Sequence, residues 1–191
     1  MKFIPQSIAE IVLIETVIHG DERGYFSETF RQDKFEEAIG YKVNFLQDNE
    51  SKSSRGILRG LHFQLPPFAQ SKLVRVVEGE VLDVAVDIRT GSPTFGQHVS
   101  VLLSGENKRQ LFIPRGFAHG FVVLSDMAIF SYKVDNYYSA ESDRGLAFDD
   151  KELDIGWQLS KEELQLSIKD QKQPVLENLG QCFSYGVSYY A

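Results

Sequence analysis

The sequence predicts a mostly β protein, a jelly roll or barrel whose short antiparallel strands enclose an interior. Residues 55–135 form a series of short apolar runs separated by Gly, Pro, Asn and Ser, a spacing typical of antiparallel β architecture. Within 81–88 the even-numbered residues are all Leu, Val or Ile, whereas the odd-numbered ones include Asp83 and Asp87. This alternation predicts a strand with one apolar face and one face toward an interior. Helices have little room in this stretch and are expected only beside it.

The elements can be placed in order along the chain. A short helix is expected over 33–39, with Asp33 at its N-cap and Gly40 just past its end. The predicted strands that follow include 59–64, 73–77, 81–88, 99–103, 121–124 and 128–134. A second helix is expected over 160–168, because Ser160 and Glu163 form a capping box and Pro174 follows as a stop. At 191 residues we expect a single domain over 1–191.

The overall charge excludes some classes of partner. Lys and Arg number 20 against 27 Asp and Glu, a net charge of −7, whereas general binders of nucleic acid or anionic membranes need a broad basic face. The single Cys182 has no partner for an intramolecular disulfide. No run approaches the roughly 18 apolar residues of a membrane span, and the first residues lack the apolar core of a signal peptide. We therefore expect a cytoplasmic protein without nucleic-acid or membrane partners.

The charge is unevenly distributed. Residues 51–77 contain no acid but five cations: Lys52, Arg55, Arg59, Lys72 and Arg75. The segment is also rich in Gly and apolar residues, which suits an interior strand better than a solvated surface. Because burying an unpaired guanidinium is costly, the segment indicates an anionic ligand such as a phosphorylated molecule.

One histidine in this segment is a candidate for proton transfer, since imidazole titrates near neutral pH. A period of two would place His62 on one face with Gly60 and Gln64, and Arg59 on the other face. The carboxylate that orients His62 is not fixed by spacing, and Asp83 and Asp170 are both candidates.

A second histidine belongs to a known motif. In FIPRGFAHGF, residues Pro114, Gly116 and His119 have the P-x-G-x-x-H spacing of the second cupin motif. The first cupin motif would require a second His at the position of Gln64. Two imidazoles without a firm carboxylate make a poor metal site, so we expect a cupin-type jelly-roll barrel without a metal.

Six segments taken together carry a family resemblance. They are DERGYFSETF (21–30), QDNESKSSRGILRGLHFQ (47–64), QSKLVRVVEGEVLDVAVDIRTGSPTFG (70–96), FIPRGFAHGF (112–121), YKVDNYYS (132–139) and IKDQKQP (168–174). Over about 5–175 the chain resembles the dTDP-4-dehydrorhamnose 3,5-epimerase family, whereas the tail 176–191 has no recognised counterpart. The resemblance implies a homodimer with an exchanged N-terminal segment, no cofactor, and conversion of dTDP-4-dehydro-6-deoxy-D-glucose to dTDP-4-dehydro-L-rhamnose.

The resemblance also implies residue roles. His62 would be the general base, Asp170 its partner and Tyr132 the proton donor, while Lys72 would face the C4 oxygen of the sugar. Tyr138 would stack on the thymine, and Asp143 stands where the family usually carries Glu. The substrate-binding residues it implies are Arg23, Glu28, Gln47, Asp48, Asn49, Arg59, Lys72, His119, Tyr138, Asp143 and Lys169.

These residue types suit the chemistry. Protons at C3 and C5 are acidic because both carbons flank the C4 ketone, and a cation at O4 stabilises the enolate that forms. Inversion needs an acid on the opposite face, and we expect a lysine near Tyr132 to draw its pKa down. Three alternatives stay open: an epimerase of C3 or C5 only, a metal-dependent cupin oxygenase, and a non-catalytic sugar-nucleotide-binding barrel.

Overall fold

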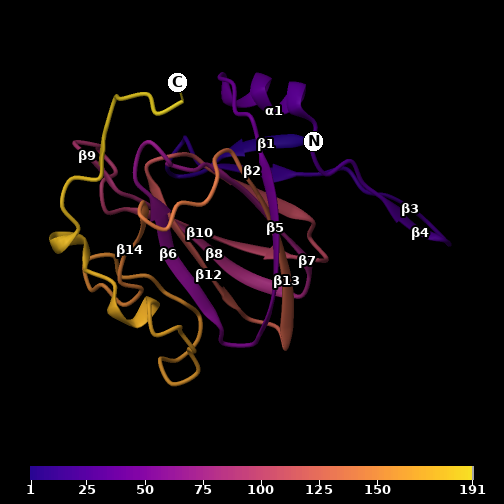
Figure 1. Ribbon diagram of the computed structural model, residues 1–191. Helices are drawn as coiled ribbons and strands as arrows, with labels where there is room; N and C mark the ends of the chain where they lie inside the picture. The colour runs from indigo at the N-terminus through magenta and orange to yellow at the C-terminus, as the bar shows by residue number, and fades with distance from the viewer. Residues whose placement is uncertain (191) are drawn as a thin grey trace.

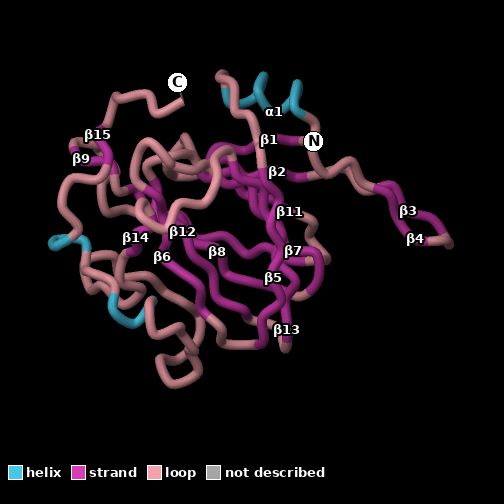
Figure 2. The backbone as a smooth tube through the Cα atoms, in the orientation of Figure 1, coloured by secondary structure: helices cyan, strands magenta, loops and turns pink. Residues whose placement is uncertain are grey.

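Two antiparallel sheets face one another in the computed structural model, which describes residues 1–190 (Figures 1 and 2). The six-stranded sheet has the order β1 (Lys2–Pro5), β2 (Val12–Glu15), β11 (Arg109–Ile113), β7 (Lys72–Glu78), β13 (Met127–Val134), β5 (Gln47–Ser54). The five-stranded sheet has the order β10 (His98–Ser104), β8 (Glu80–Asp87), β12 (Phe117–Val123), β6 (Leu58–Gln64), β14 (Asp143–Gly145). The predicted mostly β jelly roll is confirmed.

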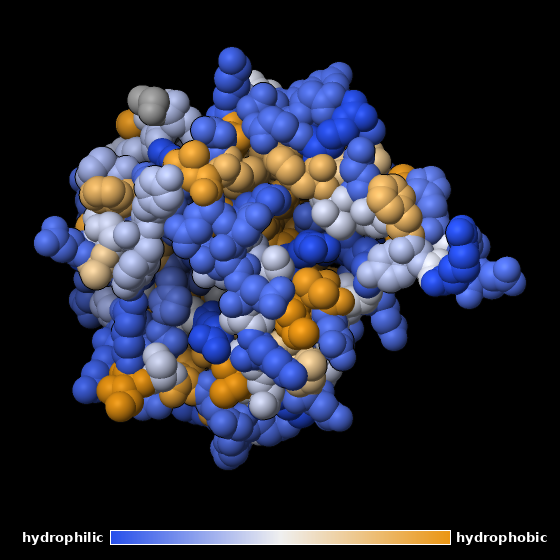
Figure 3. All heavy atoms as spheres, turned by 45° about the vertical axis from the view of Figure 1, so that its right-hand side comes forward, coloured by the Kyte–Doolittle hydropathy of each residue, from blue (hydrophilic) through white to orange (hydrophobic). Residues whose placement is uncertain are grey.

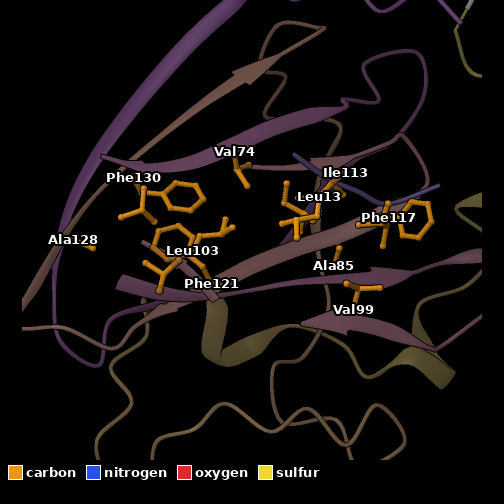
Figure 4. Packing of buried hydrophobic residues seen from close by; sticks show 14 of the residues in the cluster. Leu13, Val74, Ala85, Val99, Leu103, Ile113, Phe117, Phe121, Ala128 and Phe130 are labelled. Atoms are coloured by element: carbon orange, nitrogen blue, oxygen red, sulfur yellow. The ribbon is translucent and has the colours of Figure 1, made fainter. Parts of the chain in front are cut away.

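The main core fills the space between the sheets. Figure 4 shows Val74 and Phe130 of the six-stranded sheet pointing toward Ala85 and Phe121 of the five-stranded sheet. The rings of Phe121 and Phe130 stack with their centroids 4.0 Å apart. Each strand contributes every second side chain to this core, and the remaining positions are free to line a cavity or face outward.

Strand β8 has the two faces that its alternation predicts. Leu82, Val84 and Val86 pack in a second cluster on the outer face of the sheet, which the C-terminal part of the chain covers. Asp83 points to the inner side and is fully buried. A buried carboxylate on an inner face requires a polar partner there.

The first predicted helix is confirmed, with a different N-cap. Helix α1 (Gln32–Ile39) begins one residue earlier than expected, its N-cap is Arg31, and Asp33 lies in its first turn, where it accepts hydrogen bonds from Arg31. Gly40 ends the helix in the left-handed conformation, as predicted. The helix buries Phe35 against the outer face of the six-stranded sheet.

The second predicted helix, over 160–168, is wrong. The capping contact between the Ser160 amide and Glu163 does form, at 3.0 Å, but it closes only a turn. The chain then runs extended, and Gln165 exchanges backbone hydrogen bonds with Gly56 and Leu58. The apolar residues after the turn occur at every second position, a period that favours extended chain over helix.

Strand β6 departs from regular alternation. Its pairing with β12 matches His62 with His119 but Arg59 with Phe121, so three steps along β6 oppose two along β12. Such a bulge shifts the alternation by one position, and Arg59 and His62 line the same cavity. The prediction that Arg59 faces away from His62 is therefore wrong.

The short elements lie at the periphery. Strands β3 (His19–Asp21) and β4 (Gly24–Phe26) form a hairpin that projects from the body (Figures 1 and 3). Strand β15 (Phe183–Ser184) pairs with β9 (Arg89–Thr90), and the remaining helices are η1 (Asp170–Lys172) and η2 (Leu176–Asn178). Among residues 1–190 no helix is long and apolar enough to cross a membrane.

Candidate active site

A cavity of about 580 Å³ lies between the two sheets, and a second hollow of about 490 Å³ adjoins it. Strand β6 lines the cavity from the five-stranded sheet, and strands β7 and β13 line it from the six-stranded sheet. The residues that line both spaces are His62, Lys72, Tyr132 and Lys169. The cavity therefore brings together residues that are up to 119 positions apart in the sequence, from Ser51 to Asp170.

One wall carries a histidine paired with a carboxylate. His62 Nε2 lies 2.5 Å from Asp170 Oδ1. Asp170 sits at the start of η1 and is 4% exposed, and its backbone N–H donates to Ser167 Oγ. Burial alone would raise the pKa of Asp170, but the hydrogen bond and charge of His62, with Ser167 and Lys169, lower it. An ionised Asp170 only accepts hydrogen bonds, so Nε2 of His62 carries a proton, and in the neutral imidazole the lone pair is on Nδ1.

A second histidine pair lies deeper in the same cavity. His119 Nε2 lies 2.9 and 3.0 Å from the two carboxylate oxygens of Asp83. Burial lowers the pKa of His119, and the Asp83 carboxylate opposes that shift. The two carboxylates that the sequence left as candidate partners of His62 therefore bind different histidines: Asp83 pairs with His119, and Asp170 pairs with His62.

Lys72 is a cation of this cavity that lacks a counter-ion among the described residues, as is Arg59. Lys72 is half-buried and forms no ion pair with a carboxylate within residues 1–190. Burial lowers the pKa of Lys72 to about 8, although the charges of Asp83 and Asp143 act in the opposite direction. An ammonium that is desolvated but unpaired is prepared to meet negative charge on a ligand.

Tyr132 lines the cavity from β13, and the charge that acts on its hydroxyl is not the one expected from the sequence. Burial raises the pKa of Tyr132, and the opposing charge comes from Arg59. The expectation that a lysine draws the Tyr132 pKa down is therefore wrong. The phenol stays protonated at neutral pH, which suits a proton donor. Arg59 itself donates from Nε to Ser53 Oγ at 3.1 Å.

The adjoining hollow is polar. Its lining residues include Gln47 and Asn49 of the edge strand β5, together with Tyr138 and Asp143. The Tyr138 hydroxyl donates to Asp143 Oδ2 at 3.1 Å, and Lys169 Nζ also contacts this oxygen. Tyr138 is 63% exposed, so its ring is free to contact a ligand.

Three of the predicted binding residues lie away from both spaces. Arg23 stands in the turn of the projecting hairpin, where it pairs with Asp21 at 2.5 Å, and Glu28 follows the hairpin and contacts Lys34 at 3.7 Å. Asp48 points to the other side of β5 from its neighbours and pairs with Lys133 at 2.9 Å. The alternation of the strand separates Asp48 from Gln47 and Asn49.

Two further residues were not assigned to the site from the sequence. Ser167 contacts the backbone of Asp170 and lines the cavity, and its place within the expected helix concealed it. Gln64, at the position of the second cupin His, is buried and holds backbone groups of Phe68, Tyr137 and Ser139 at 2.7–3.1 Å. Its amide is thereby committed to fixing the loops around the adjoining hollow.

Comparisons with known proteins agree with this geometry. The sequence profile of the dTDP-4-dehydrorhamnose 3,5-epimerase family matches residues 5–178. The dTDP-4-dehydrorhamnose 3,5-epimerase of Shigella flexneri is 59% identical over 157 residues, which cover 82% of this chain and 87% of that protein.

Solved structures extend the likeness to the fold. A dTDP-6-deoxy-D-glucose-3,5-epimerase from Legionella pneumophila, crystallised with dTDP-4-keto-L-rhamnose, is 50% identical with a TM-score of 0.93, covering 97% of this chain and 99% of that one. A 3'-monoepimerase from Streptomyces bikiniensis, in complex with dTDP-quinovose, is 35% identical with a TM-score of 0.89, covering 95% and 92%. Profile, sequence and fold agree over nearly the whole chain, which therefore belongs to the dTDP-4-dehydrorhamnose 3,5-epimerase family.

Proposed function

We propose that the protein converts dTDP-4-dehydro-6-deoxy-D-glucose to dTDP-4-dehydro-L-rhamnose by inverting C3 and C5. The observation that carries this proposal is one cavity with three features: a histidine on one sheet paired with the η1 carboxylate, a phenol on the facing sheet, and an unpaired lysine. A base and an acid on opposite walls are what inversion of a carbon through a planar enolate requires.

His62 is the general base in this scheme. Its lone pair on Nδ1 takes the proton from C3 or C5, and the positive charge that develops on the ring is stabilised by Asp170. Because both carbons flank the same ketone, one base can serve both inversions if the sugar shifts or changes pucker between the two steps. The proton that His62 gains leaves to solvent before the second inversion.

Lys72 stabilises the enolate. Removal of either proton places negative charge on O4, and an ammonium aimed at this oxygen interacts more strongly with the enolate than with the ketone. Burial raises the strength of this interaction because little water competes for the oxygen. His119, held by Asp83, lines the same space and would act as a further contact to the sugar.

Tyr132 supplies a proton to the enolate from the face opposite His62. Its protonated phenol donates to C3 or C5 of the enolate. The phenolate that results is stabilised by the charge of Arg59 and regains a proton from solvent before the second inversion. Arg59 and Lys169 also supply positive charge for the diphosphate.

The thymidine end would occupy the adjoining hollow. Gln47 and Asn49 offer amide groups to the nucleotide, and the exposed ring of Tyr138 can stack on the thymine. Asp143 contacts both Tyr138 and Lys169. Its role in this chain would be to hold these two ligand-binding side chains in place.

We also propose a homodimer in which the hairpin completes the partner's site. The segment 17–26 exposes Val17, Ile18, Tyr25 and Phe26 by 46–69%, more apolar surface than an isolated arm would keep in water. In a second copy the arm would bring Arg23 and Glu28 to the nucleotide. Sedimentation should then give a dimer, and complementation of an Arg23→Ala chain by a His62→Ala chain should restore activity in mixed dimers.

A narrower epimerase of C3 or C5 alone is the second candidate, because the 35% identical relative from Streptomyces bikiniensis is a 3'-monoepimerase of the same fold. Incubation with the dTDP-4-keto-6-deoxy sugar in D2O, followed by NMR, separates the two. Deuterium at both carbons with an L-rhamno product supports double epimerisation, and deuterium at one carbon supports the narrower activity. Absence of deuterium at both carbons would contradict the proposal. His62→Ala is the control, since it should abolish exchange while retaining nucleotide binding.

A further inference from the structure

Tyr190 of the C-terminal tail belongs to a hydrogen-bond network that is half-buried or buried. The hydroxyl of Tyr190 accepts the backbone N–H of Arg115 at 2.9 Å and shares a hydrogen bond with Ser71 Oγ at 2.8 Å. The backbone N–H of Ser71 donates to Asp135 Oδ1 at 2.6 Å, and Arg115 Nε donates to Asp135 Oδ2 at 3.1 Å. These four residues form a closed ring of contacts, here called the tail clamp.

The tail clamp joins the ends of three strands that carry site residues. Ser71 immediately precedes Lys72 at the start of β7, and Asp135 follows the end of β13, three residues after Tyr132. Arg115 lies in the turn before β12, which carries His119. Lys72 itself pairs with the last residue of β13 in the sheet, so the clamp lies at the point where these strands meet.

The polar groups of the tail clamp have few alternative hydrogen-bond partners. Ser71 is fully buried, Asp135 is 6% exposed, and every buried side-chain polar atom within residues 1–190 has a partner. The Arg115 guanidinium also lies over the Tyr190 ring, 5.1 Å from its centre, and donates to the carbonyl of Tyr189. Loss of the Tyr190 hydroxyl would leave Ser71 Oγ buried without that partner.

We propose that Tyr190 is a positioning residue for catalysis, which through the tail clamp fixes the start of β7 and thereby the direction of Lys72 toward the C4 oxygen. The proposal rests on the function proposed above, because Lys72 must stabilise the enolate for its direction to matter. Tyr190 contacts neither the cavity nor the ligand space, so its effect passes through Ser71.

The test compares Tyr190→Phe, Ser71→Ala and the double variant with wild type, using Tyr185→Phe as a matched control. Tyr185 lies in the same tail and is 48% exposed, outside the clamp. Loss of the clamp hydrogen bond should lower kcat on the order of tenfold through misplacement of Lys72, with KM for the sugar nucleotide changed less than about twofold. Water admitted around Lys72 should also move the alkaline limb of the kcat profile to higher pH.

Both single variants remove the hydrogen bond between Tyr190 and Ser71, and Tyr190→Phe also removes those to the Arg115 backbone and the Tyr41 hydroxyl. The double variant should therefore be no slower than Tyr190→Phe alone. The control should match wild type. If Tyr190→Phe lowers the melting temperature but leaves kcat and the alkaline limb unchanged, the clamp is structural only and the proposal is overturned. Multiplicative losses in the double variant would also overturn it. An inactive wild-type protein would instead defeat the proposed function, and that result is obtained before any variant is measured.

Discussion

Replacing Lys72 by Met should make the protein more stable and nearly inactive. Burial lowers the pKa of Lys72 from its ordinary value of 10.5 to about 8, which means that the folded state holds the ammonium less favourably than the unfolded chain does. At 1.36 kcal/mol per pH unit the full difference corresponds to about 3 kcal/mol, and partial exposure of the side chain to water reduces it to about 1–3 kcal/mol. Methionine has a similar length and no charge, so the variant should recover that amount at pH 7.

The sign of the pH dependence follows from the same pKa values. Between pH 8 and 10.5 the unfolded chain binds more protons at Lys72 than the folded protein does, so the wild type gains stability as pH rises. The stability advantage of Lys72→Met should therefore be complete below pH 8 and disappear by about pH 10.5. Catalysis should fall by about 10²–10³ in kcat because the enolate loses its cation.

Urea unfolding of wild type and variant at several pH values measures this difference directly. Lys52→Met is the matched control, since Lys52 is an exposed lysine of the same acid-free segment and its replacement should change stability little at any pH. The reasoning would be refuted if Lys72→Met were less stable than wild type at pH 7. A stability difference that stays constant from pH 7 to 10.5 would also refute it, because the charge of Lys72 would then not be its cause.

Three further variants test separate parts of the structure. Asp170→Asn should slow deuterium exchange by about 10²-fold, because the Nε2–H of His62 loses its carboxylate acceptor. Unchanged exchange would show that Asp170 does not assist the base. Tyr132→Phe should still exchange protons but form inverted product about 10²-fold more slowly, and normal inversion would point to another acid. Gly60→Ala should lower the free energy of unfolding by about 1–3 kcal/mol, because its Cβ would lie 2.5 Å from the Cα of Gly120. If this variant unfolds at the same urea concentration as wild type, strands β6 and β12 can move apart to accept the added methyl group, and the predicted loss is wrong.

The strands could be predicted from the sequence because each carries its own alternation. In 81–88 the apolar face and the inward Asp83 both follow from residues two positions apart. The bulge in β6 could not be predicted in this way, because it depends on the close approach of Gly60 to Gly120 on a strand about 60 residues away. That contact decides whether Arg59 faces the cavity.

The segment 160–168 shows how a local signal can mislead. Its capping contact is real, but backbone pairing of Gln165 with Gly56 and Leu58 offers the chain a partner that a helix would exclude. Tertiary pairing outweighs helix propensity over such a short span. The pairing of His62 with Asp170 spans 108 positions, and spacing alone left Asp83 as an equal candidate, so only the family resemblance favoured Asp170.

The charges of the cavity explain how Lys72 can be both desolvated and protonated. Asp83 is fully buried and holds His119, and burial keeps the imidazole neutral by lowering its pKa. The pair therefore retains one negative charge near Lys72, which raises the Lys72 pKa against the effect of burial without forming an ion pair with the ammonium. A carboxylate in direct contact would hold the Lys72 protons and compete with O4 of the substrate. Because the Asp83 carboxylate is bonded to His119 instead, the Lys72 ammonium stays charged at neutral pH and free to meet the enolate.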